Sequence, residues 1–133
     1  MNKLAQKHLE IIELAKTHAK RSYRDKLTSM AAVLLTKKGN MYTGINVKYK
    51  KIWKCICAER VAIAKAIEAG ETDFDTIVTV KYFPETDTFT VMNMCGECRQ
   101  IAICHAPFNI ISLDKKTTKV EPIEKILPYA YVS

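Results

Sequence analysis

The sequence predicts an α/β fold in which helices cover both faces of a central sheet of about five strands. Some segments repeat apolar residues at intervals of three and four, as amphipathic helices do. Other segments alternate apolar and polar residues, or carry short apolar runs between turn residues, as strands do. The two kinds of segment alternate along the chain, and this order is typical of a sheet with a layer of helices on each side.

The first third of the chain predicts one helix and one β-hairpin. The helix is expected over residues 3–21, where the apolar side chains share one face. Strands are expected over residues 29–36 and 41–47, and Lys38-Gly39-Asn40 supplies the turn between them.

The segment after this hairpin has no clean period. We expect a loop over residues 48–54, in which Trp53 packs beneath the functional site rather than covering it. The other predicted elements are a helix over 57–69 ended by Gly70, strands over 74–82 and 88–92 joined by a turn over 84–87, a helix over 95–104, a strand over 108–113 and a short helix over 122–127.

Length and composition are those of one domain, residues 1–133. The 133 residues are 48% hydrophobic, which is enough for a sizeable core. No signal-peptide pattern or membrane-length apolar run is present, so we expect a cytoplasmic protein without membrane contact. The formal net charge of +7 is scattered along the chain, which does not favour nucleic-acid binding. One cluster stands out, and we call it the basic patch: Lys48, Lys50, Lys51 and Lys54.

Three cysteines and one glutamate predict a zinc site with a base beside it. Cys95 and Cys98 are three residues apart at the start of a helical run, so their sulfurs point the same way. Cys57 opens another helical run and could supply a third ligand, which leaves the fourth tetrahedral position for water. An open position is typical of catalytic zinc. Glu59, in the first turn after Cys57, is interpreted as the general base.

Four other potential metal ligands receive structural interpretations. Cys55 and Cys104 are interpreted as small buried apolar residues. His8 and His18 fall in the first helix with no third ligand nearby, and we interpret them as surface or interface histidines.

Four segments carry a resemblance to a known family. In chain order they are Gly44-Ile45-Asn46-Val47, Cys57-Ala58-Glu59-Arg60, Cys95-Gly96-Glu97-Cys98-Arg99-Gln100 and Ile126-Leu127-Pro128-Tyr129-Ala130-Tyr131-Val132. They span nearly the whole chain and resemble the cytidine deaminase family, small tetrameric zinc enzymes that act on free nucleosides. The ending and the Asn46 loop are most similar to the blasticidin-S deaminase branch.

The resemblance implies a three-layer α-β-α fold with a mixed sheet, and a homotetramer with one Zn²⁺ per subunit. Cys57, Cys95 and Cys98 would be the zinc ligands, and Glu59 would move protons from water to the departing amino group. The substrate would be cytidine, deoxycytidine or an analogue such as the antibiotic blasticidin S, with no nucleic-acid partner.

The resemblance also assigns residues around the metal and the sugar. Asn46 matches the sugar-binding asparagine, with a turn-stabilising role as the alternative. Arg60 would donate hydrogen bonds to a ligand sulfur and offset, with the amino ends of two helices, the net negative charge of three thiolates on one dication. Arg99 and Gln100 would support the second metal-binding helix, and for Arg99 an ordinary surface position is the alternative.

Four departures from the family pattern affect substrate recognition and leave the zinc ligands and the base in place. Lys48 replaces the family's sugar-binding glutamate, and an ammonium group cannot accept a hydrogen bond from a ribose hydroxyl. Thr28 stands near the position of a base-stacking aromatic residue, and Asn93-Met94 replaces Ser-Pro. The basic patch suggests that Lys48 binds a carboxylate or phosphate on the substrate. A solvated basic loop is the alternative.

Two other functions compete with nucleoside deamination. Deamination of bases within RNA or DNA would suit the positive charge, but those enzymes more often use histidine as the first ligand, where Cys57 stands here. A structural zinc site would need a fourth protein ligand, and His105 is the only candidate. The distance of His105 beyond Cys98 along the helix disfavours this reading.

Overall fold

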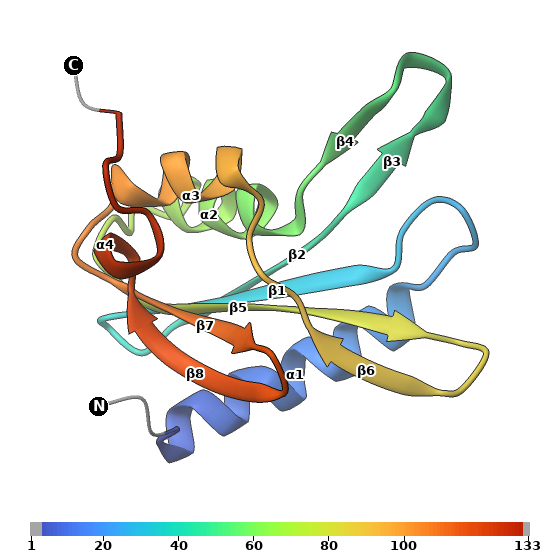
Figure 1. The fold of residues 1–133 in the computed structure, drawn as a ribbon, viewed down its shortest axis with the longest axis horizontal. Coiled ribbons are helices and arrows are strands. Elements are labelled where there is room, and N and C mark those ends of the chain that lie inside the picture. The colour runs from blue at the N-terminus through green and yellow to red at the C-terminus, as the bar shows by residue number, and fades with distance from the viewer. Residues whose placement is uncertain (1–3, 132–133) are drawn as a thin grey trace.

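A computed structural model describes residues 4–131 and places a six-stranded mixed sheet between two layers of helices (Figure 1). The strands are ordered β2-β1-β5-β7-β8, and β6 pairs with β5 beside this path. The predicted three-layer α/β fold is confirmed, and the central sheet has one strand more than expected.

The helices and strands have the following bounds in chain order: α1 (Gln6–Ser22), β1 (Met30–Thr36), β2 (Met41–Ile45), β3 (Val47–Tyr49), η1 (Lys50–Ile52), β4 (Lys54–Ile56), α2 (Ala58–Glu68), β5 (Phe74–Phe83), β6 (Thr88–Val91), α3 (Gly96–Ile103), β7 (Asn109–Asp114), β8 (Thr117–Pro122) and α4 (Ile123–Ile126).

Each face of the sheet has its own core. On one face, α1 packs Ile11, Ile12 and Ala15 against Val33 and Val78 of the sheet. The opposite face carries α2, α3 and α4, as Figure 1 shows. Its core includes Ala32, Leu34, Ala62, Ala66, Phe74, Ile77, Cys98, Ala102, Phe108, Ile110 and Ile123. The two helices that begin at the predicted metal ligands therefore share one face of the sheet.

The strand β5 pairs with two different strands, β6 and β7, on the side of the sheet where the chain leads into α3. Its first half pairs in parallel with β7 at Thr76 and Ile77, and its second half pairs antiparallel with β6 from Val80 to Phe83. Both β6 and β7 therefore lie along the same edge of β5. The chain leaves β6 at this junction and rises to the start of α3 (Figure 1).

Gly44 lets α2 lie directly on β2. A Cβ atom at this position would lie 2.7 Å from the backbone nitrogen of Ala62 and would also clash with the backbone oxygen of Ala58. Both contacts are backbone atoms of α2, which cannot swing aside as a side chain can. Only glycine fits here, and the contact fixes the height of α2 above the sheet.

The segment 48–54 is a projecting hairpin, so the loop prediction was wrong. The strands β3 and β4 pair from Val47 opposite Ile56 to Tyr49 opposite Lys54, and η1 forms the turn (Figure 1). Trp53, expected to pack beneath the site, is 93% exposed at this turn. The strands have only three residues each. Tyr49 and Ile56 are exposed and Val47 is only half-buried, so no buried periodicity reveals them.

The strand β8 was missed because it lies at the edge of the sheet and is mostly polar. It pairs along its whole length with β7, yet Val120 is its only fully buried residue within the described chain. Short edge strands of this kind carry no apolar alternation from which they could be predicted.

The helix α1 begins at Gln6, whereas residue 3, where we expected its start, lies outside the described residues. His8 is buried rather than on the surface. Its Nδ1 accepts a hydrogen bond from the backbone N–H of Ala5 at 2.9 Å. Burial lowers the pKa of His8, which favours the neutral ring that can accept this bond. Across residues 4–131, no helix combines the length and the apolar character needed to cross a membrane.

Candidate active site

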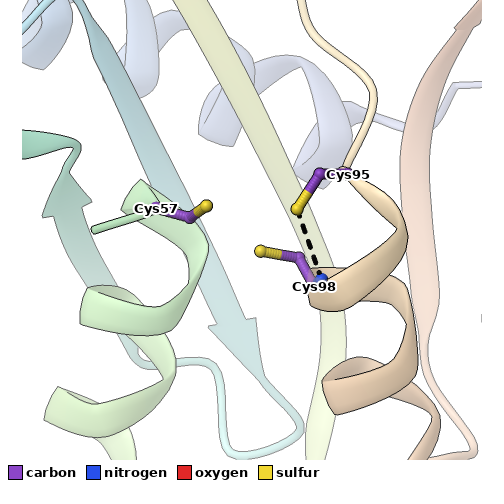
Figure 2. A group of neighbouring side chains, drawn as sticks. All are labelled: Cys57, Cys95 and Cys98. Carbon is purple, nitrogen blue, oxygen red and sulfur yellow. Dashed lines mark hydrogen bonds between the residues drawn. The ribbon is translucent and has the colours of Figure 1, made fainter. Parts of the chain in front are cut away.

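The three cysteines of the predicted zinc site come together at the amino ends of two neighbouring helices. Cys57 precedes α2, Cys95 precedes α3, and Cys98 lies in the first turn of α3. Figure 2 shows the sulfur of Cys57 facing those of Cys95 and Cys98 across the space between the helices. The three Sγ atoms all lie within 4.8 Å of one another.

This donor set fits zinc. Tetrahedral zinc with Zn–S bonds of about 2.3 Å holds its sulfur ligands about 3.8 Å apart, so small side-chain shifts bring the three thiolates to bonding distance. Soft thiolate ligands also favour zinc over hard cations such as Mg²⁺. His105 packs its ring on Phe74, with ring centroids 4.9 Å apart, and is not part of the cysteine group. Three protein donors and an open fourth position are the arrangement of a catalytic zinc site.

Burial raises the pKa of two of the three thiols, whereas hydrogen bonds lower that of the third. Burial raises the pKa of Cys98 and of Cys57 above the ordinary thiol value. Burial also acts to raise the pKa of Cys95, but hydrogen bonds outweigh it, including one from the backbone N–H of Cys98 at 3.4 Å, so that this pKa is lowered. Metal binding must displace the protons from all three sulfurs, so the affinity for zinc falls as the pH falls.

Arg60 brings positive charge to the sulfurs. Its Nη2 pairs with Glu97 Oε1 of α3 at 3.1 Å. Burial acts to lower the pKa of Arg60, but hydrogen bonds with Cys98 and Glu97 outweigh this effect and raise it above its ordinary value. The guanidinium thus links α2 to α3 next to the cysteine group, where it can offset the negative charge of thiolates.

Glu59 lies beside the cysteines in a cavity of about 180 Å³. It belongs to the first turn of α2, and its side chain is 6% exposed. The same cavity is lined by Cys57, Cys95, Asn46 and Lys48. The structure therefore gathers a buried carboxylate, two of the three candidate ligands and both predicted substrate-binding residues around one space.

Asn46 is held in a fixed orientation. Its Oδ1 accepts hydrogen bonds from Thr28 Oγ1 at 3.0 Å, from the backbone N–H of Ser29 at 3.0 Å and from that of Met30 at 2.9 Å. These donors fix the amide oxygen, so the Nδ2 group must lie on the other side. Asn46 is 2% exposed, and its Nδ2 has no partner within residues 4–131. A buried amide N–H₂ without a partner is suited to bind a ligand.

Thr28, which stands where an aromatic residue was expected, instead helps to orient Asn46. Thr28 is buried and donates to Asn46 from a place 18 residues earlier in the chain. Sequence reasoning missed this contact because no local pattern links the two residues.

Asn93 and Met94, where the resemblance led us to expect Ser-Pro, hold the segment before α3 in place. Asn93 Nδ2 donates to the backbone oxygen of Leu113 at 2.9 Å, and the backbone N–H of Leu113 donates to Asn93 Oδ1 at 2.7 Å. This pair of bonds ties the segment before α3 to β7. Met94 is buried in the core beneath α2 and α3. The residues before α3 are therefore held to the sheet by hydrogen bonds and by a buried side chain.

Arg99 and Gln100 fasten segments around α3 in different ways. Arg99 Nε donates to the backbone oxygen of Met94 at 3.0 Å, which braces the start of α3. Gln100, which we expect to support the metal-binding helix, bonds through its amide to the tail. Its Nε2 donates to the backbone oxygen of Tyr131 at 2.8 Å, and its Oε1 accepts from the Tyr131 N–H at 3.1 Å. Gln100 thus holds the carboxyl-terminal segment against α3.

The expectation that Cys55 and Cys104 are buried was wrong. Both side chains are exposed. Cys55 belongs to β4 and also lines the cavity that holds Glu59. Its place there depends on the projecting hairpin, which the sequence pattern did not indicate.

Comparison with known proteins identifies the family. Residues 5–112 match the model of the cytidine and deoxycytidylate deaminase zinc-binding region. The chain belongs to the cytidine and deoxycytidylate deaminase family. This family of hydrolytic deaminases has a zinc-binding domain, and the cysteine group described above is its possible zinc-binding site in this chain. The resemblance found in the sequence is thereby confirmed.

Individual members of the cytidine and deoxycytidylate deaminase family match most of the chain. A blasticidin-S deaminase from Bacillus cereus is 32% identical over 96% of this chain and 94% of its own length. A probable cytidine deaminase from Dictyostelium discoideum is 35% identical over 74% of this chain and 65% of its own length. A crystal structure of a cytidine deaminase from Burkholderia pseudomallei superposes with a TM-score of 0.75 at 28% identity, covering 93% of this chain and 98% of that one.

Proposed function

We propose that this protein is a zinc-dependent hydrolase that converts a cytosine nucleoside, such as cytidine or deoxycytidine, to its uracil form and releases ammonia. The observation that carries this proposal is the position of Glu59. A buried carboxylate lines the same cavity as Cys57 and Cys95, beside a group of three cysteines that fits zinc. A structural zinc site has no need of such a group, and it would normally have a fourth protein ligand.

The chemistry follows from the residues around this cavity. Zinc, when bound by Cys57, Cys95 and Cys98, supplies the Lewis acidity that makes water nucleophilic near neutral pH. Glu59 accepts a proton from the attacking water, whose oxygen bonds to C4 of the cytosine ring. Glu59 delivers this proton to ring nitrogen N3, then takes the proton of the new C4 hydroxyl and passes it to the amino nitrogen. The C–N bond breaks, ammonia leaves, and the C4 carbonyl and the N3–H of uracil remain.

Release of ammonia tests the proposal. We expect the zinc-loaded protein to release ammonia from at least one of cytidine, deoxycytidine, cytosine and blasticidin S. Treatment with a chelator should abolish the release, and added zinc should restore it, because the described residues that line this cavity supply no Lewis acid themselves. Protein that contains one zinc ion per chain and leaves all four compounds intact would contradict the proposal.

Blasticidin S is a second candidate substrate. The 32% identity to a protein named blasticidin-S deaminase extends over almost the full length of both chains. The assay above compares this antibiotic directly with the free nucleosides, so the ratio of kcat/KM values assigns the substrate.

We infer that Asn46 binds the sugar and that Thr28 positions it. Replacing Thr28 with valine removes one of the three donors to Asn46 Oδ1. We expect KM for the nucleoside to rise about fivefold with little change in kcat, since one neutral hydrogen bond contributes about 1 kcal/mol. Steady-state kinetics measure both constants. Thr28→Ser keeps the hydroxyl and should retain the original KM, and a rise in KM for Thr28→Ser as large as that for Thr28→Val would show that the hydroxyl is not what positions Asn46.

The family's homotetramer is retained as a proposal. Four large apolar side chains of the hairpin are exposed, namely Tyr49, Ile52, Trp53 and Ile56, and contact with another subunit would cover them. A cytoplasmic location and the absence of a nucleic-acid partner also remain predictions from the sequence.

A further inference from the structure

One end of the candidate active-site cavity offers hydrogen-bond donors and lacks the usual carboxylate acceptor. Asn46 uses its oxygen for three hydrogen bonds with the chain and keeps its buried Nδ2 group without a partner in the described residues. Lys48 is half-buried, stands two residues further along the extended chain and lines the same cavity. Its ammonium group can donate hydrogen bonds but cannot accept them. A ligand that satisfies both groups must present acceptor atoms.

Lys48 also lines a second cavity, of about 260 Å³. The backbone N–H of Lys48 donates to the backbone oxygen of Leu27 at 3.0 Å, which ties the base of the β3–β4 hairpin to the wall of this second cavity. Thr28 and Ser29, which hold Asn46, belong to the same wall. The two cavities therefore meet at Lys48.

The second cavity is rich in unneutralised positive charge. Its cationic lining consists of Arg24, Lys26, Lys48, Lys50 and Lys81. None of these five side chains forms an ion pair within residues 4–131. The cavity has two carboxylates, Asp25 and Glu85, and Asp25 already accepts a hydrogen bond from Tyr23. Cations outnumber anions here, so the cavity attracts negative charge.

The basic patch predicted from the sequence divides into two parts. Lys48 and Lys50 line the second cavity, whereas Lys51 and Lys54 line neither of the two cavities that meet at Lys48. Arg24, Lys26 and Lys81, from other parts of the chain, complete the cationic lining. Part of the basic patch thus faces the second cavity, and Lys51 and Lys54 remain exposed on the hairpin.

We propose that the substrate carries an anionic oxygen group, a phosphate or a carboxylate, on its sugar, and that Lys48 and the second cavity bind this group. The inference rests on the proposed function for the position of the base, which would lie at the Glu59 end of the first cavity. Phosphate and carboxylate oxygens accept hydrogen bonds from Lys48 while a sugar oxygen accepts from Asn46, and the charge of the anionic group matches the cations beyond Lys48.

Binding of reaction products tests this inference without requiring turnover. Zinc-loaded protein is titrated calorimetrically with uridine, uridine 5′-monophosphate and the 5′-carboxylate of uridine at low ionic strength. We expect one or both anionic compounds to bind about tenfold more tightly than uridine, with the advantage shrinking as salt is added. The comparison of the two anionic compounds identifies the preferred group.

Two lysine-to-glutamate substitutions on the hairpin test whether Lys48 causes the preference for anionic compounds. Lys48→Glu should remove the preference for the anionic compounds. Lys54→Glu makes the same change in net charge at an exposed position that lines neither cavity, and should preserve the preference. Equal binding of all three compounds, a preference that survives Lys48→Glu, or no binding of any compound would overturn the inference. Deamination of cytidine without an anionic preference would refute this inference alone, whereas preferential binding without any deamination would refute the proposed function alone.

Discussion

Replacing Glu59 with glutamine is expected to lower kcat for ammonia release by a factor of about 10²–10⁴, the usual contribution of a positioned proton-transfer group. Glutamine has nearly the same shape but cannot accept the proton from water. Glu59 is not among the three cysteines that form the candidate metal group, so the variant should keep its zinc. Steady-state kinetics together with the measured zinc content per chain check both parts of this expectation.

Glu68→Gln is the matched control for this substitution. Glu68 is exposed at the far end of the same helix, so its replacement should leave both kcat and zinc content unchanged. If Glu59→Gln bound zinc and retained full activity, Glu59 could not be the group that moves the proton. Loss of zinc in Glu59→Gln would point to a role in holding the metal site together.

Replacing Gly44 with alanine is expected to destabilise the protein by about 3 kcal/mol, which is the upper end of the usual cost of overpacking. The added Cβ would lie 2.7 Å from the backbone nitrogen of Ala62 and would force α2 away from β2. For a chain of this size we expect the melting temperature to fall by about 10 °C. Because α2 carries Glu59 and begins at Cys57, its displacement should also weaken zinc binding.

Gly96→Ala is the control that distinguishes the clash expected for Gly44→Ala from a general cost of replacing glycine with alanine. Gly96 is the first residue of α3, and a Cβ there would meet no atom within 4 Å. Alanine at this position should leave the melting temperature unchanged or raise it slightly, since it restricts the unfolded chain. A Gly44→Ala variant as stable as Gly96→Ala would contradict the close contact between α2 and β2.

The metal group was predictable because its determinants are local. A Cys-x-x-Cys pair at a helix start places two sulfurs together, and a cysteine followed two residues later by glutamate at another helix start supplies the third thiol and the carboxylate. The pairing of these two helices came from the resemblance to a family. The structure then brings Cys57, Cys95 and Cys98 within 4.8 Å of one another.

The substrate end of the site was less predictable because its determinants are distant in sequence. The bond from Thr28 to Asn46 joins a loop to the end of another strand. The position of Lys48 between two cavities depends on a hairpin whose three-residue strands leave no periodic signal. The edge strand β8 was missed for a related reason, since few of its side chains are buried. The periodic spacing of buried apolar residues predicts the elements that build the core. Elements that only shape a surface lack this pattern and are not predicted by it.

The exposed Trp53 gives the protein a built-in optical label. It is the only tryptophan in the sequence, and it stands 93% exposed at the turn of the β3–β4 hairpin. Its indole fluorescence therefore reports the solvent around this hairpin rather than the state of the core. Loss of the core on heating is better followed by circular dichroism of the helices. A subunit that covers the hairpin should shift the tryptophan emission to shorter wavelength, so assembly can be followed without attaching a dye.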